Sequence, residues 1–181
     1  MTTSRRAQHN DEPPHLFIDR NLSDNELILA LRAFEFTVTS YYDYYTPERV
    51  PDPQLVPDED IIAECSAKKW VLVTADRDLE YRHFAAIKKS SISIFIVPDN
   101  CSKPTRWAKS LLDAQAELYR TVKNYRQPFV ARINASGKVY QLRCITFADS
   151  APKDCALLIN DGKTDHISAK KFRKAASKGA A

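Results

Sequence analysis

Four short apolar runs alternate with segments of helical periodicity along the first hundred residues, and this alternation constrains the fold most strongly. The apolar runs are residues 15–19, 37–42, 70–76 and 91–98. The helical segments between them are residues 25–35, 58–69 and 79–89, with Asp24 available to cap the first. Strands that alternate with helices form a parallel sheet with helices on both faces. The sequence therefore predicts a three-layer α/β/α domain with a central, mostly parallel sheet.

The remaining segments complete this domain. Residues 43–57 contain four prolines, which disfavour regular structure, so we expect a loop there. A long amphipathic helix is predicted over residues 105–125. Two alternating runs about Ser136-Gly137 then predict a β-hairpin over residues 129–143. We therefore divide the chain into a flexible N-terminal segment (1–14), one domain (15–143) and a C-terminal extension with a basic tail (144–181).

Composition excludes several classes of protein. With 181 residues, of which 44% are hydrophobic, the chain can bury a substantial core. No apolar run approaches the roughly 18 residues of a membrane span, and the N-terminus is polar, so we expect a cytoplasmic protein. The four cysteines and four histidines have neither C-x-x-C nor H-x-x-x-H spacing, which argues against a zinc site and a disulfide framework.

The net charge of +4 is concentrated at the C-terminus. Seven of the 27 Lys/Arg and three of the 23 Asp/Glu fall within residues 151–181, which leaves 20 of each sign in residues 1–150. Such a basic tail is usually solvated and disordered, and in a nucleic-acid-binding protein it can instead contact phosphates. Lys171 and Arg173 are the tail residues that we expect to contact RNA if the second alternative holds.

Carboxylates stand where the predicted strands end. Asp19 closes the strand 15–19, Asp76 and Asp78 follow the strand 70–76, and Asp58 with Asp60 opens the helix that leads into that strand. The carboxyl ends of adjacent parallel strands lie at one edge of a sheet, where α/β proteins place their ligand sites. We therefore expect these acids to converge.

Converging carboxylates repel one another, and a divalent cation is the simplest compensation for burying them. Hard oxygen ligands without histidine or cysteine favour Mg²⁺ or Mn²⁺ over zinc. A metal bound in this way can activate water for attack on a phosphodiester. Each acid taken singly also has a structural interpretation as a helix cap or a turn residue.

These residues carry a resemblance to a known family. The segments "LFIDRNLS", "PDEDIIAECSAKKWVLVTADRDL", "FIVP" and "PFVARINASGKVYQL" resemble the PIN-like domain family, in a compact form similar to VapC-type toxin ribonucleases, over roughly residues 15–143. In that family a helix-initial Asp precedes the Asp of a T-x-D turn by about eighteen residues. Here Asp58 precedes Asp76 by that interval, with Thr74 in place, which favours Asp58 over Asp60.

The resemblance implies a metal-dependent endoribonuclease that acts as the toxin of a toxin and antitoxin pair. It implies Asp19, Asp58 and Asp76 as metal ligands and Asp78 as an assisting residue that orders water. Longer members carry a further acid in mid-chain, where this sequence has its proline-rich loop. Glu48, Asp52 and Glu59 are the substitutes that the sequence leaves open. RNA as substrate and an antitoxin protein as partner follow from the resemblance alone, and a homodimer remains open.

Other residues are candidates for substrate binding. Arg20 could face a phosphate, and Asn21 could bond a site carboxylate or the substrate, although such residues more often cap the turn that follows a strand. The aromatic run "SYYDYYTP" could stack unpaired bases, with Tyr44 as the candidate residue, and contact with a partner or simple packing of the loop is about as consistent with the sequence.

Two other functions remain alternatives. One is a non-catalytic module on the same scaffold, with a vestigial acidic pocket and with RNA or a protein as its partner. The other is a phosphoacceptor regulatory domain, which also gathers aspartates around Mg²⁺. That domain expects a lysine just after a later strand, and "IFIVPDN" has none, so we rank it last.

Overall fold

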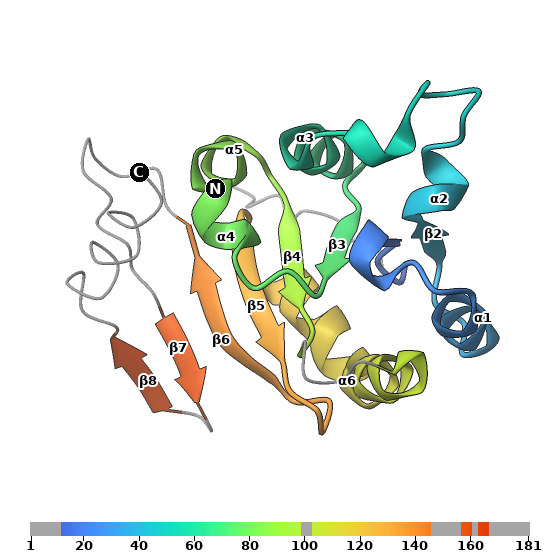
Figure 1. Cartoon of the computed structure of the whole chain (residues 1–181). Helices are drawn as coiled ribbons and strands as arrows, with labels where there is room; N and C mark the ends of the chain where they lie inside the picture. The colour runs from blue at the N-terminus through green and yellow to red at the C-terminus, as the bar shows by residue number, and fades with distance from the viewer. Residues whose placement is uncertain (1–11, 99–102, 146–156, 161–162, 167–181) are drawn as a thin grey trace, which may run out of the picture.

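A computed structural model describes residues 12–98, 103–145, 157–160 and 163–166, and Figure 1 shows its arrangement of elements. The main sheet has six strands in the order β2-β1-β3-β4-β5-β6. Their bounds are β1 (Leu16–Ile18), β2 (Val38–Ser40), β3 (Val71–Thr74), β4 (Ser93–Ile96), β5 (Phe129–Ile133) and β6 (Val139–Cys144). All neighbouring pairs are parallel except β5 and β6. The predicted mostly parallel sheet is therefore confirmed.

Helices cover both faces of this sheet (Figure 1). The α-helices are α1 (Asn25–Ala33), α2 (Tyr41–Tyr44), α3 (Asp58–Lys68), α4 (Leu79–Arg82), α5 (Phe84–Lys89) and α6 (Pro104–Asn124). Residues of α1 and α6 pack on one face with Leu16 and Ile18, whereas residues of α2, α3 and α5 pack on the other with Phe17. The strands β1, β3 and β4 are buried along their whole length, as expected for a sheet covered on both sides.

Two predicted elements differ from the observed ones. The strand expected over 37–42 ends at Ser40, because the Ser40 hydroxyl accepts a bond from the Asp43 amide at 3.1 Å and caps the one-turn helix α2. The helix expected over 79–89 is divided at His83 into α4 and α5. The proline-rich segment is mainly loop, with a 3-10 turn η2 at Pro53–Leu55. Asp24 caps α1 as predicted, accepting bonds from the Glu26 and Leu27 amides.

The predicted hairpin forms and joins the main sheet, because β5 pairs with β4 as well as with β6. Gly137 in its turn has φ +76°, and a Cβ atom there would lie 2.2 Å from Cβ of Asp113 on α6. The structured domain continues to Ile145, which is buried and donates its amide to the Pro128 carbonyl. The hairpin thus packs closely on α6.

Little of the C-terminal extension lies within the described residues. Its strands β7 (Leu157–Asn160) and β8 (Lys163–His166) form a separate antiparallel pair, and Figure 1 shows β7 on the side of β6. The sequence analysis did not predict these two strands. Within the described ranges, the helices are too short or too polar to serve as membrane spans.

Candidate functional site

The candidate site lies where β1 and β3 end. These strands are parallel neighbours, with Ile18 opposite Val73, and the Asp19 amide continues the pairing by donating to the Val73 carbonyl at 3.0 Å. Both strands leave the sheet at this point: β1 continues into the 3-10 turn η1 (Arg20–Leu22), and β3 continues into the turn that contains Asp76. The topology therefore brings the ends of two strands that are distant in sequence to one edge of the sheet.

Asp19 is the most buried of the predicted acids, with only 5% of the residue exposed. Its Oδ1 accepts the Arg20 amide at 2.7 Å, and its Oδ2 accepts the Thr74 hydroxyl at 2.7 Å. Burial raises the pKa of Asp19, and the neighbouring charge of Asp58 raises it further, against the hydrogen bonds from Thr74 and the Arg20 amide. Asp19 and Asp58 are therefore close enough for their charges to interact.

Thr74 connects Asp19 with the turn of Asp76. Its hydroxyl accepts bonds from the Asn21 side-chain amide at 3.1 Å and from the Asp76 backbone amide at 3.0 Å, while it donates to Asp19. The Asn21 carbonyl oxygen accepts the Ala75 amide at 3.1 Å. Asn21 was expected to bond a carboxylate or the substrate. Its observed partners are instead Thr74 and Ala75, so it orders the end of β3.

Asp58 begins α3, but it does not cap the helix. The cap position is Pro57, which has no side-chain bond to the helix. The Asp58 carboxylate instead turns toward the site, where its Oδ1 pairs with Nη2 of Arg20 and its Oδ2 lies 3.1 Å from Nε2 of His83. The side chain of Asp58 is 14% exposed. The alternative that Asp58 is only a helix cap is therefore wrong for this structure.

Arg20, which could face a phosphate or order the turn, is bound by groups of its own chain in this structure. Besides pairing with Asp58, Arg20 donates from Nη1 to the carbonyls of Gln54 and Val56, at 3.3 and 3.2 Å. Its guanidinium carbon also lies 5.7 Å from the centroid of the Tyr41 ring. Both terminal nitrogens are thus engaged by protein oxygens, because the proline-rich loop folds down over η1.

Asp76 and Asp78 occupy the outer part of the site. Asp76 Oδ1 accepts the Asp78 amide at 2.9 Å, which is a turn-forming bond, and its Oδ2 pairs with Nη2 of Arg82. Asp78 is exposed and stands at the N-cap position of α4 without a side-chain capping bond. Asp76 therefore has a structural role in the turn. Its backbone amide also bonds the Thr74 hydroxyl, which donates to Asp19.

His83 is a residue of the site that sequence reasoning missed. Its Nδ1 lies 2.6 Å from Oε1 of Glu59 and its Nε2 lies 3.1 Å from Oδ2 of Asp58. The ring thus stands between two acids of the first turn of α3, one of which, Glu59, the sequence had left open as a substitute acid. No spacing signal could have found His83, because its position depends on the break between α4 and α5.

The donor set suits a hard divalent cation, although the described arrangement is not that of a ready ligand cage. Among residues 12–98 and 103–145, no three His, Cys, Asp or Glu side chains gather in a metal-binding group. The reason is visible in the contacts: Asp58 pairs with Arg20, and Asp76 pairs with Arg82. Carboxylate oxygens are the type of ligand that Mg²⁺ and Mn²⁺ prefer. To bind such an ion, Asp58 and Asp76 would each have to release the arginine with which it pairs.

Tyr44 does not present a surface for stacking bases. The residue is 9% exposed, and its ring packs edge-on against Phe17 and Trp70, while the Arg49 guanidinium lies 3.9 Å from its centroid. Its hydroxyl donates to Glu64. The base-stacking role considered for Tyr44 is therefore corrected, because Tyr44 packs in the core with Tyr41 and Tyr45, whereas Tyr42 is 45% exposed. Lys171 and Arg173 lie outside the described residues.

The comparison with known protein families agrees with the observed fold. A sequence profile of the family described as PIN like domain matches residues 14–99, which include all four predicted acids. No curated protein and no solved structure matches the chain significantly. PIN-like domains are generally nucleases, so the match indicates a nuclease-type module with nucleic acid as its substrate class. Over residues 14–99, a little under half of the chain, the sequence is similar to the PIN-like domain family.

Proposed function

We propose that this chain is a metal-dependent endoribonuclease of PIN-like type, with Asp19, Asp58 and Asp76 as ligands of Mg²⁺ or Mn²⁺. The observation that carries the proposal is the buried carboxylate of Asp19, which lies at the shared edge of β1 and β3 within the electrostatic reach of Asp58. The two carboxylates repel one another, and a divalent ion would offset that repulsion. Thr74 connects the same carboxylate to the turn of Asp76.

The roles of the side chains follow from their exposure. Asp19 is buried and rigidly bonded, so it supplies a fixed oxygen ligand. Asp78 is exposed at the rim and can order water beside the site. A divalent ion at these carboxylates would lower the pKa of bound water and neutralise charge on the phosphate. Arg82, whose side chain is 54% exposed, is the cation best placed to turn from Asp76 to a substrate phosphate.

We further propose that the chain acts in the cytoplasm as the toxin of a toxin and antitoxin pair. This part is supported by the resemblance to VapC-type toxins. A gene for a small regulator beside the gene for this chain, and co-purification of the two products, would test it. Size-exclusion chromatography of the pair and of the chain alone would determine whether either forms a homodimer.

The nuclease is tested by substituting the acids one at a time. Asp58→Asn and Asp76→Asn keep the side-chain shape but remove the charge that holds the ion. Loss of an outer-shell partner already costs about 10- to 100-fold, so loss of a ligand should lower the rate of RNA cleavage at least about a hundredfold. Asp43→Asn is the matched control, because Asp43 forms an exposed pair with Arg32 and stands outside the candidate site.

Cleavage would be measured on a fluorescently labelled single-stranded RNA with Mn²⁺ and with a chelator. Each variant is purified identically, so that a contaminating nuclease would appear equally in all of them. Retained cleavage in both Asp58→Asn and Asp76→Asn would refute the assignment of these ligands.

A second function is favoured by one specific observation, namely the arginines on Asp58 and Asp76. They neutralise the acids within the protein, as expected of a vestigial site in a non-catalytic RNA- or protein-binding module. A calorimetric titration with Mn²⁺ separates the two functions. Binding that is lost in Asp19→Asn supports the nuclease, whereas the absence of binding at millimolar Mn²⁺ supports the binding module.

A further inference from the structure

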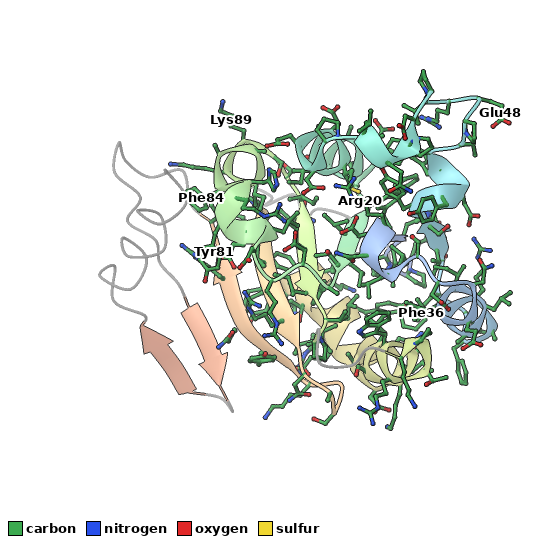
Figure 2. The ribbon with its side chains drawn as sticks, viewed as in Figure 1. Arg20, Phe36, Glu48, Tyr81, Phe84 and Lys89 are labelled. Carbon is green, nitrogen blue, oxygen red and sulfur yellow. The ribbon has the colours of Figure 1, made fainter. Side chains whose placement is uncertain are left out.

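Arg20 is the residue through which the candidate site contacts the proline-rich loop. We define this loop as residues 46–57, between α2 and α3. The backbone amide of Arg20 bonds Asp19, its Nη2 pairs with Asp58, and its Nη1 bonds the loop carbonyls of Gln54 and Val56. Figure 2 shows the Arg20 side chain between η1 and the start of α3. The side chain of Arg20 thus joins Asp58 to the loop, while its backbone amide bonds Asp19.

The two arginines of the site differ in how they are held. Arg82 extends from α4 with 54% of its side chain exposed, and it pairs with Asp76 at the surface. Arg20 is 29% exposed and combines a carboxylate with two backbone carbonyls. Charge-assisted bonds to several acceptors hold a guanidinium more firmly than one exposed ion pair does. Displacing Arg82 therefore needs a change of rotamer, whereas displacing Arg20 also releases the loop.

We propose that Arg20 is a positioning residue that competes with the divalent ion for Asp58 and couples the order of loop 46–57 to the occupancy of that carboxylate. The competition with the metal rests on the proposed function. The contact between Arg20 and the loop is observed independently of that function. A divalent ion on Asp58 takes electron density from the oxygens that bond Arg20 and repels the guanidinium. Metal binding should therefore weaken the attachment of the loop.

The competition predicts an unusual sign for a substitution. Arg20→Gln removes the positive charge from Asp58 and shortens the side chain that reaches the loop carbonyls. We expect its affinity for Mn²⁺ to rise about tenfold over the wild type, because the ion no longer displaces a guanidinium. A purely structural role predicts the opposite, an affinity that is unchanged or lower because the site is less ordered.

The matched control is Arg32→Gln. Arg32 also joins a carboxylate to a backbone carbonyl, with Nη2 at 2.7 Å from Asp43 and at 3.4 Å from the Val38 oxygen. It lies outside the site, so its loss should leave Mn²⁺ affinity unchanged. The affinities would be measured by titration calorimetry on the full chain, at one pH and one ionic strength. An affinity of Arg20→Gln equal to that of Arg32→Gln, with Mn²⁺ binding intact, would overturn the competition and leave the proposed function standing.

Hydrogen exchange of loop 46–57 supplies a readout that needs no metal. We expect faster exchange in the loop for Asp58→Asn and for Arg20→Gln, because each removes one side of the ion pair. Adding Mn²⁺ should accelerate exchange in the wild type and have little further effect in Arg20→Gln. Mn²⁺ binding without a change in loop exchange would overturn the coupling.

The exchange measurement also separates the inference from the proposed function. If neither the wild type nor Arg20→Gln bound Mn²⁺, the metal-dependent function would fail, and the positioning role would be decided by exchange alone. A loop that stays equally protected in Asp58→Asn then overturns the positioning role. A loop that loses protection in Asp58→Asn, but not in the control Arg32→Gln, supports it.

Discussion

A buried ion pair ties the helix that follows the acidic turn to the C-terminal hairpin. Arg143 on β6 donates from Nη1 to Oε1 of Glu80 on α4 at 2.5 Å, and the two side chains are only 8% and 6% exposed. Arg132 on β5 lies further away, with Nη2 4.0 Å from the second oxygen of Glu80. Because α4 begins immediately after Asp78, this pair helps to place the outer part of the site.

Replacing Arg143 with methionine should destabilise the fold strongly. Breaking a buried ion pair on one side costs about 3–5 kcal/mol, because the remaining charge stays buried without its partner. Arg132 can compensate part of the Glu80 charge, so we expect a loss near the lower limit, about 3 kcal/mol. A domain with a total stability of about 5–15 kcal/mol remains folded after such a loss.

The control for Arg143→Met is an ion pair of the same length at the surface. Lys109 and Asp113 on α6 are also 2.5 Å apart, but the lysine side chain is 70% exposed. Lys109→Met should therefore change the free energy of unfolding by less than about 0.5 kcal/mol. The contrast isolates burial, since the separation of the charged atoms is the same in both pairs.

The assay is urea unfolding followed by far-ultraviolet circular dichroism, on four chains: wild type, Glu80→Gln, Arg143→Met and the double variant. The double variant should be more stable than the sum of the single losses predicts, by at least about 1 kcal/mol, because it leaves no unpaired charge. The reasoning is refuted if the free energy of unfolding of Arg143→Met lies within about 0.5 kcal/mol of that of Lys109→Met, which is a factor of about two in the unfolding equilibrium. It is also refuted if the losses of the two single variants simply add.

Two further predictions concern the acids and the tail. Burial raises the pKa of Asp19 in the folded chain, so the folded state binds the Asp19 proton more tightly than the unfolded state does. The resulting stabilisation is fully present below the ordinary carboxyl pKa of about 4, and it is lost as the pH rises through the raised pKa of the folded state. In metal-free buffer, Asp19→Asn should therefore gain stability relative to the wild type across that pH range, and parallel curves of unfolding free energy against pH would contradict this. Deleting residues 169–181 removes five Lys/Arg, so the slope of log RNA affinity against log salt should flatten by up to about 3.5 units, at about 0.7 per phosphate contact. Identical slopes in the full and shortened chains would show that the tail contacts no phosphate.

Local sequence patterns determined which elements form. The alternation of apolar runs and helical segments predicted the parallel sheet, Asp24 marked the start of α1, and Ser136-Gly137 marked the hairpin turn. The same patterns placed Asp19 and the turn of Asp76 at one edge of the sheet, because parallel neighbours end together. These features depend on residues that are close in sequence or on a general rule of topology, so one sequence suffices to predict them.

Only the tertiary structure decided what each side chain contacts. The pairing of Arg20 with Asp58 joins residues 38 positions apart, and the pair of Glu80 with Arg143 joins residues 63 positions apart. Tyr44 illustrates the same limit. Its aromatic ring suits base stacking as well as core packing, and in the structure the ring packs in the core against Phe17 and Trp70. Charge and aromaticity establish what a residue can bind. Which partner a residue contacts depends on the packing of segments that are distant in sequence. The guanidinium of Arg20, for example, could have faced a phosphate but pairs with the carboxylate of Asp58.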